Sequence, residues 1–182
     1  MISRLLYDKG YNEFVTVAER IKKKYPEVTF EIAGTINEET PSGVPKNVVE
    51  EDDRAGRIKY LGHINDITKE LMDSNTVVVL PSYYREGMNR SLMEACSCGR
   101  PIITTNLPGL KEMVADGENG YLVRPRDVDS LYDAIILFMN LTIEERKRMG
   151  VRSRKIAEER FDVERVKDMY IQIITQIKSE YV

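Results

Sequence analysis

Residues 76–96 read TVVVLPSYYREGMNRSLMEAC, and this stretch decides the fold. Its first five residues put apolar side chains on both faces of an extended chain, which is typical of a strand buried in a parallel sheet. Pro81 ends that strand. Apolar residues then recur at helical spacing from Leu92 to Cys96 until Gly99 supplies a stop. The stretch therefore predicts a strand, a loop and a helix, the unit from which doubly wound α/β domains are built.

Two glutamates flank the start of the predicted helix. Glu86 lies in the loop before it, and Glu94 lies inside it. The backbone N–H groups of Met88 to Ser91 are expected to be free at this helix start, where they and the helix dipole attract a diphosphate. Carboxylates suit neutral hydroxyls instead. The spacing alone fits a solvated helix face as well as a ligand site, so both interpretations stay open at this point.

The rest of the chain alternates between strand-like and helix-like segments, which predicts a parallel sheet covered by helices on both faces. Residues 1–5 are expected to be the end of a truncated first strand. The other predicted strands cover residues 28–34, 58–62, 76–82, 101–106 and 120–123. The predicted helices cover residues 10–24, 66–73, 90–98, 109–115 and 127–140. Between them, residues 36–56 are expected to form a variable loop with at most a short helix and no chemistry.

Two more helices are expected after this alternating region. Thr142 to Glu145 match a capping box, and a long helical segment begins at Asp162. One apolar stripe runs along that last helix, formed by Val163, Val166, Met169, Tyr170, Ile173, Ile174 and Ile177. We therefore expect residues 1–141 to form one Rossmann-like domain and residues 142–182 to pack on it. Docking of the last helix on a second domain is the alternative.

Composition narrows the classes of function. The 182 residues are 42% hydrophobic and carry a net charge of −3, which suits one globular domain and argues against nucleic acid as a partner. No run approaches the roughly 18 apolar residues of a transmembrane helix, and no signal peptide opens the chain. Cys96 and Cys98 lie two residues apart on one helix, so their side chains point to different faces and cannot bridge. Reduced thiols and a cytoplasmic location are therefore expected. With one histidine and no paired cysteine motif, no metal site is expected.

Several short motifs follow one another along the chain: residues 3–5 (SRL) with 9–10 (KG), 30–34 (FEIAG), 60–62 (YLG), 79–82 (VLPS), 86–87 (EG), 92–95 (LMEA), 99–103 (GRPII), 108–109 (PG) and 116–123 (DGENGYLV). In this order they resemble the C-terminal, donor-binding half of retaining glycosyltransferases of the GT-B fold, in particular those of family 4, group 1 type. The resemblance covers nearly the whole chain. It implies an α/β fold with a Rossmann-like parallel β-sheet flanked by helices and a C-terminal helical tail.

The resemblance also implies roles for individual residues. Glu86 and Glu94 match the family's paired-glutamate motif, in which the first binds donor-sugar hydroxyls and the second binds the ribose. The donor diphosphate lies on the main chain between them, and Arg4 and Lys9 lie beside the leaving diphosphate, where positive charge stabilises it. Arg4, Lys9 and Glu86 are thus the expected catalytic residues. The other expected donor-binding residues are Ile64 and Asp66, which lie against the base, and Gly87, Met88, Asn89, Arg90, Ser91 and Glu94.

The implied reaction is retaining transfer of a hexose from a nucleoside-diphosphate sugar, with a UDP-sugar favoured, to a hydroxyl acceptor in bacterial surface-polysaccharide or glycan synthesis. No metal or other cofactor is implied. The expected partners are the nucleotide-sugar donor, an N-terminal acceptor domain absent from these 182 residues, and a membrane-associated, lipid-linked acceptor reached through that domain. We expect this chain to bind donor without turnover, in the cytoplasm or at the inner face of the membrane.

Two other functions are considered: a UDP-sugar epimerase of GT-B architecture, and a non-enzymatic doubly wound binding module such as a response-regulator receiver. The Leu80-Pro81-Ser82 run followed by Glu86-Gly87 suits a transferase better than an epimerase. A receiver needs an acceptor aspartate at a strand end, and residues 77–81 and 1–6 contain no acid. The chain also lacks the glycine-rich motifs of dinucleotide-binding enzymes and ATPases.

Overall fold

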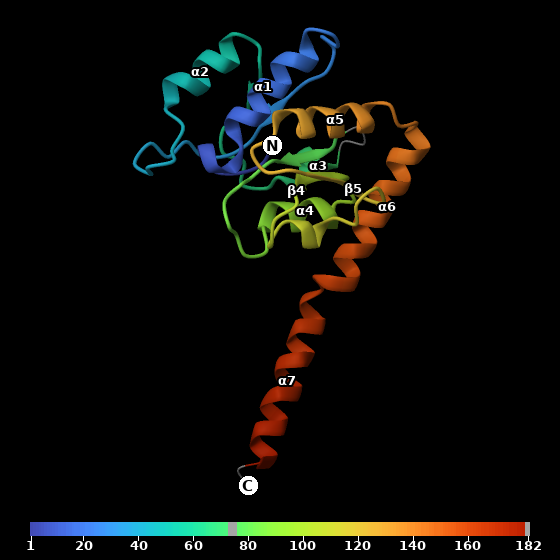
Figure 1. Cartoon of the computed structure of the whole chain (residues 1–182). Helices are drawn as coiled ribbons and strands as arrows, with labels where there is room; N and C mark the ends of the chain where they lie inside the picture. Colours follow the sequence, from blue (N-terminus) through green and yellow to red (C-terminus); the bar gives the residue numbers. More distant parts are fainter. Residues whose placement is uncertain (73–75, 181–182) are drawn as a thin grey trace.

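Parallel strands form the centre of the computed structural model, which describes residues 1–72 and 76–180 (Figure 1). One pair consists of β1 (Glu31–Ile32) and β2 (Lys59–Tyr60). A second set has the order β3 (Val78–Leu80), β4 (Ile102–Thr105) and β5 (Gly120–Val123). All these pairings are parallel. The predicted parallel α/β fold is confirmed, and each strand lies inside the range predicted for it.

Residues 1–5 lie on the side of β1 that faces away from β2. Ala33 exchanges hydrogen bonds with Met1 and Ser3, whereas its neighbour Ile32 accepts from Leu61 N at 2.9 Å. Adjacent residues of a strand direct their backbone groups to opposite sides, so the two partners flank β1. A small cavity shows that this segment also lies next to β3, because its lining includes Ile2, Ala33, Val77 and Val78. The spatial order is therefore β2, β1, residues 1–5, β3, β4 and β5, which is the order of a Rossmann fold.

Helices cover both faces of these strands. They are α1 (Tyr11–Lys22), α2 (Lys46–Arg54), α3 (Thr68–Leu71), α4 (Arg90–Ser97) and α5 (Val128–Met139), with 3₁₀ turns η1 (Tyr7–Lys9) and η2 (Lys111–Met113). Figure 1 shows α5 on one side of β4 and β5 and α4 on the other. Every residue of β3 and β4 is consequently buried, as predicted for strands covered on both faces.

The helix predicted over residues 109–115 is reduced to the short turn η2. The Asn119 side chain accounts for this difference, because its Oδ1 accepts from Ala115 N (2.7 Å) and its Nδ2 donates to Met113 O (3.0 Å). These bonds take over backbone groups that a longer helix would have paired internally.

The α2 helix occupies part of the region predicted to be a variable loop. Asp52 of α2 is buried and accepts from Tyr11 Oη (2.7 Å) and Arg57 Nε (2.6 Å). Burial, together with the bond to Asp52, raises the pKa of Tyr11 well above its ordinary value. The acidic run 50–53 thus contains a residue that anchors α2 to α1, which its charge pattern did not indicate.

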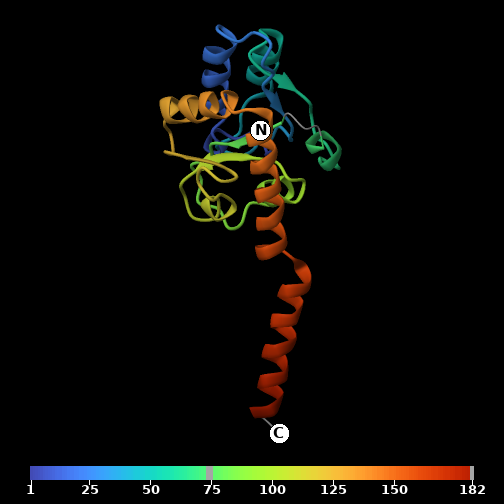
Figure 2. The same cartoon turned by 90° about the vertical axis from the view of Figure 1, so that its right-hand side faces the viewer.

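The two C-terminal helices pack differently. The predicted capping box starts α6 (Ile143–Arg160): Thr142 Oγ1 accepts from Glu145 N (3.2 Å), and Thr142 N donates to the Glu145 carboxylate (2.8 Å). α6 packs against α4. In contrast, α7 (Val163–Glu180) extends away from the body (Figures 1 and 2).

The apolar stripe of α7 is exposed along its length, at Val163, Val166, Met169, Tyr170, Ile173, Ile174 and Ile177. The expected packing of residues 142–182 on the domain is therefore seen for α6 and is not seen for α7, because α7 leaves the body where α6 ends. Among the described residues, no helix has the length and apolar composition needed to cross a membrane.

The two cysteines are free thiols in different surroundings, and we expect them to react at different rates. Burial raises the pKa of the Cys96 thiol to about 12, whereas Cys98 is only half-buried. Because the thiolate is the reactive form, a Cys98→Ser variant at pH 8 should react with an aromatic disulfide reagent at least about a hundredfold more slowly when folded than in denaturant. Fast labelling of the folded variant would contradict the buried position of Cys96.

Candidate functional site

The candidate site lies at one edge of the sheet. The carboxyl ends of parallel strands meet at a single edge, and ligands of open α/β folds bind there at the point where the strand order reverses. Here that point lies between residues 1–5 and β3, since the later strands lie on opposite sides of it. The loops that leave these two segments carry Lys9 and Glu86.

Lys9 and Glu86 form a buried ion pair between the two loops. Lys9 Nζ lies 2.7 Å from Glu86 Oε1, and the two side chains are 8% and 13% exposed. Gly10, which follows Lys9, has φ +82° and approaches Pro81 so closely that a Cβ on it would lie 2.3 Å from Pro81 O. Only glycine fits this contact. The structure thus brings together two charges that are far apart in the sequence.

Glu86 is oriented by further hydrogen bonds. Ser82 Oγ lies 2.9 Å from Glu86 Oε1, and Asn89 Nδ2 donates to Oε2 at 2.8 Å. With Lys9, three groups therefore use the acceptor capacity of the carboxylate, which has about four positions. One position is left for a ligand hydroxyl, and the orientation of the carboxylate is set before a ligand arrives.

Asn89 also sets the start of α4. Its Oδ1 accepts from Leu92 N at 3.1 Å, so it is the N-cap of the helix. Its own N–H donates to Gly109 O at 3.3 Å, which corrects the prediction that every N–H group from Met88 to Ser91 is free. In the described part of the chain, three N–H groups of this run donate no hydrogen bond, those of Met88, Arg90 and Ser91. With the helix dipole, they form a position that favours an anion.

Gly109 packs directly on the loop that carries Glu86. Its φ is +86°, and a Cβ on it would lie 2.2 Å from Glu86 O and 2.4 Å from Gly87 O. Two backbones therefore meet with no side chain between them. Nothing in the sequence indicated this contact, which supports both Glu86 and the start of α4.

Arg4, Arg90 and Glu94 have more solvent around them. Arg4 is exposed. Arg90 Nε donates to Glu94 Oε1 at 2.9 Å, with side chains that are 88% and 31% exposed. An exposed pair at this helical spacing contributes only about 0.3–0.5 kcal/mol. A ligand hydroxyl can therefore replace Arg90 as the partner of Glu94 at little cost.

Ile64 and Asp66 lie in the loop after β2, at the same edge of the sheet. Ile64 is half-buried and packs against the hydrophobic core. Asp66 is exposed, and its Oδ1 accepts from both the hydroxyl and the N–H of Thr68; these bonds lower the pKa of the Asp66 carboxyl. The loop is held beside the one after β1, because Gly34 N donates to Gly62 O at 2.8 Å. No group of three or more His, Cys, Asp or Glu among the described residues is placed to hold a metal ion.

Comparison with known proteins identifies the group to which this domain is related. Residues 1–156 match the family described as glycosyl transferases group 1. The chain belongs to this family. Its predicted membership among glycosyltransferases with the GT-B fold is thereby confirmed.

Relatives of this group 1 domain are longer proteins. Glycogen synthase of Mycobacterium tuberculosis is 30% identical over 139 residues, which cover 74% of this chain and 32% of that protein. The N,N'-diacetylbacillosaminyl-diphospho-undecaprenol alpha-1,3-N-acetylgalactosaminyltransferase of Campylobacter jejuni is 30% identical over 151 residues, covering 83% of this chain and 37% of that protein. A crystal structure of Anabaena Alr3699/HepE in complex with UDP matches with a TM-score of 0.83 and 23% identity, over 96% of this chain and 47% of that one. The chain spans less than half the length of each of these three proteins.

The group 1 site contains contacts that sequence reasoning missed. An asparagine directly before a helical pattern is a known N-cap signal, so the capping role of Asn89 could have been inferred. Nothing in the sequence indicated that Ser82 contacts Glu86. Cations cover the aromatic rings of the same loop: Arg126 lies 4.3 Å from the Tyr83 ring centroid, and Lys9 Nζ lies 5.0 Å from that of Tyr84.

Proposed function

We propose that this chain is the donor-binding half of a retaining glycosyltransferase, which transfers a hexose from a nucleoside-diphosphate sugar to a hydroxyl acceptor. One observation carries the proposal: a carboxylate oriented by Lys9, Ser82 and Asn89 lies beside a helix start with unpaired N–H groups. Such a site offers a hydroxyl acceptor and an anion cradle side by side, as a nucleotide sugar requires. The Anabaena neighbour, whose crystal structure is a complex with UDP, supports uridine diphosphate as the nucleotide.

In this proposal the diphosphate lies at the start of α4, with Arg4 and Lys9 beside it. Lys9 gives one of its three N–H donors to Glu86 and keeps two for a phosphate oxygen. Negative charge grows on the diphosphate as its bond to the sugar breaks, and cations and N–H groups that are already in place stabilise it. Glu86 binds a sugar hydroxyl and so positions the anomeric carbon.

Glu94 and the loop after β2 are proposed to hold the nucleoside. Glu94 lies one turn into α4, where ribose hydroxyls would replace its exposed partner Arg90. Ile64 offers an apolar contact to the face of the base, and the Asp66 carboxylate accepts from N–H donors on its edge. This division matches each side chain with the part of the donor whose chemistry it suits.

The acceptor is proposed to bind to another domain, because the chain spans only 32% to 47% of the three relatives. The name of the Campylobacter relative describes a sugar linked to diphospho-undecaprenol. That name supports a lipid-linked glycan as acceptor and a place at the cytoplasmic face of a membrane. The 182 residues alone are then expected to bind donor without turning it over.

A titration with UDP tests the proposal. UDP at about one hundred times its Kd should stabilise the folded chain by about 2.7 kcal/mol, and GDP, ADP and their sugars make the comparison set. Replacing Arg4 and Glu94 together by alanine should weaken the binding of UDP at least about tenfold, because two charged contacts are lost. The matched control removes Arg148 and Glu158, an exposed arginine and glutamate of α6, and should leave affinity unchanged. Micromolar UDP affinity that survives in the Arg4 and Glu94 double variant would overturn the site.

A further inference from the structure

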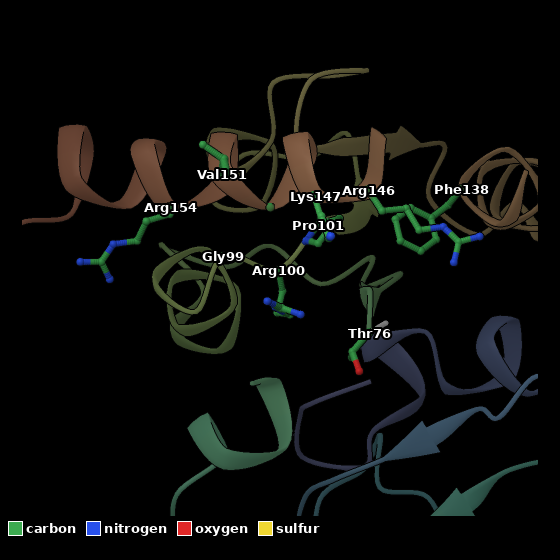
Figure 3. Close-up of a pocket in the computed structure, with 10 residues that line it drawn as sticks. Thr76, Gly99, Arg100, Pro101, Phe138, Arg146, Lys147, Val151 and Arg154 are labelled. Atoms are coloured by element: carbon green, nitrogen blue, oxygen red, sulfur yellow. The ribbon is translucent and has the colours of Figure 1, made fainter. Parts of the chain in front are cut away.

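A cavity with basic walls lies at the other edge of the sheet. It has a volume of about 380 Å³ and is formed where α6 passes the turn between α4 and β4 (Figure 3). Thr76 and Pro101 line it, and they lie two residues before β3 and one residue before β4, at the amino ends of these strands. Among the described residues that line the cavity, four are cationic and none is acidic; the cations are Arg100, Arg146, Lys147 and Arg154.

Two glycines build the floor of this cavity. A Cβ on Gly150 would lie 2.5 Å from Gly99 O, so the backbone of α6 touches the turn directly. Lys147 and Arg154 lie three residues before and four residues after Gly150, which puts all three on one face of the helix. Arg154 is held in place because its Nη1 donates to Ser97 O at 2.8 Å. The close contact thus brings charges of α6 to the cavity in a defined arrangement.

Arg146 has a hydrogen-bond donor for which the described part of the chain provides no acceptor. Its Nη2 donates to Met139 O at 2.6 Å, and its guanidinium lies 5.2 Å from the centroid of the Phe138 ring, beside which Figure 3 shows it. These contacts fix the group, yet its Nε is buried with no hydrogen-bond partner among the described residues. Buried donors in proteins are nearly always paired. An oxygen atom of a ligand would complete this one.

Positive charge exceeds negative charge among the described residues that line the cavity. The side chain of Arg154 pairs with Glu158 on the exposed side of α6. Lys147 is exposed and forms no ion pair within the described chain. Because opposite charges are attracted to such a cluster, an anion is the ligand that the lining favours. A volume of this size corresponds to about twelve water molecules, which is more room than a single small ion needs.

We propose that this cavity binds a phosphate-bearing anion, such as a small polyphosphate or a phosphorylated headgroup, at a site separate from the donor site. Helix α4 separates the two positions: its first residues form the candidate diphosphate cradle, and its last, Ser97, adjoins the basic cavity. Eight residues of helix span about 12 Å. A single small polyphosphate or headgroup therefore does not fill the donor site and the basic cavity at once.

Inorganic pyrophosphate is the soluble probe for this site, with saturating UDP present so that the donor site is occupied. Isothermal titration should show binding that weakens at least about tenfold in Lys147→Glu, because a charged contact becomes a repulsion. The matched control is Arg148→Glu, the next residue of the same helix, which makes the same charge change and does not line the cavity. It should weaken the binding of pyrophosphate less than about threefold, as expected when only long-range electrostatic attraction is reduced.

Vesicles distinguish a lipid headgroup from a free anion. Co-sedimentation with phosphatidylglycerol vesicles, but not with phosphatidylcholine vesicles, that is lost in Lys147→Glu and kept in Arg148→Glu would support the cavity and assign its ligand to a membrane. Pyrophosphate binding that is lost in Lys147→Glu and kept in Arg148→Glu would support the cavity as the site of a soluble anion. Equal effects of the two variants, or no binding of either probe by the unmodified chain, would overturn the proposal. The two variants are read out separately from UDP affinity, because neither Lys147 nor Arg148 belongs to the proposed donor site.

Discussion

Replacing Lys9 by methionine is expected to lower the free energy of unfolding by about 3 kcal/mol and to weaken the binding of UDP at least about tenfold. Methionine keeps the length of the side chain but leaves the Glu86 carboxylate buried without its counter-charge, and removal of one partner of a buried pair is strongly destabilising. Ser82 and Asn89 still donate to that carboxylate, so the loss stays near the lower end of the usual range. Urea denaturation measures the stability, and calorimetric titration measures the affinity.

A second substitution separates structure from binding. Glu86→Gln in the Lys9→Met background removes the remaining charge, so most of the lost stability should return, since a buried pair can be replaced by neutral groups with little net cost. UDP-sugar binding should stay weak, because the cation and the carboxylate proposed to contact the donor are both gone. Strictly additive losses of stability in the two single variants and the double variant would contradict a direct interaction between these side chains.

The strands could be predicted because their signal is local. Residues 77–80 are apolar on both faces, and only a strand covered by helices on both sides can bury such a pattern. Residues 102–105 are all β-branched, which also favours a strand. The capping box at Thr142 was predictable for the same reason, since its two partners are three residues apart. Each of these features depends on neighbours in the sequence, and the structure reproduces each of them.

The candidate site was predictable only one residue at a time. Sequence and family resemblance singled out Lys9 and Glu86, but their ion pair joins loops from two strands, and only the fold brings them together. Ser82 and Gly109 belong to motifs that carry the family resemblance, but neither motif indicates a contact with Glu86, since a serine or a glycine in a loop is common. Their roles come from contacts with Glu86 and its backbone.

The packing of the last helix could not be predicted from its pattern. An apolar stripe shows that a helix has a face to bury but does not say against what. Val163, Ile173 and the rest of the stripe are exposed in this chain, so the apolar face was recognised correctly, and docking on a second domain, the alternative expected from the sequence, stays a prediction. Asp52 is the converse case, because it belongs to a region expected to be a variable loop, and yet it is buried and bonded to Tyr11 and Arg57.

Replacing Gly109 by alanine is expected to destabilise the chain by about 3 kcal/mol or more. A left-handed backbone destabilises alanine by about 1–2 kcal/mol. Its Cβ would also overlap Glu86 O at 2.2 Å and Gly87 O at 2.4 Å. Neither oxygen can move without moving the loop that carries Glu86, and such forced shifts cost about 1–3 kcal/mol more. The shifted loop also loses the bond from Asn89 N to Gly109 O, so UDP affinity should fall at least about tenfold.

Gly117→Ala is the control that isolates the backbone contact. Gly117 has φ +78°, close to that of Gly109, but a Cβ on it would meet no atom within 4 Å. It should therefore cost only the conformational term, about 1–2 kcal/mol, and should leave UDP binding unchanged. Thermal and urea unfolding of the two variants give the difference directly. If Gly109→Ala costs no more than Gly117→Ala and binds UDP normally, the loop that carries Glu86 can yield, and its close packing on Gly109 is not what positions the site.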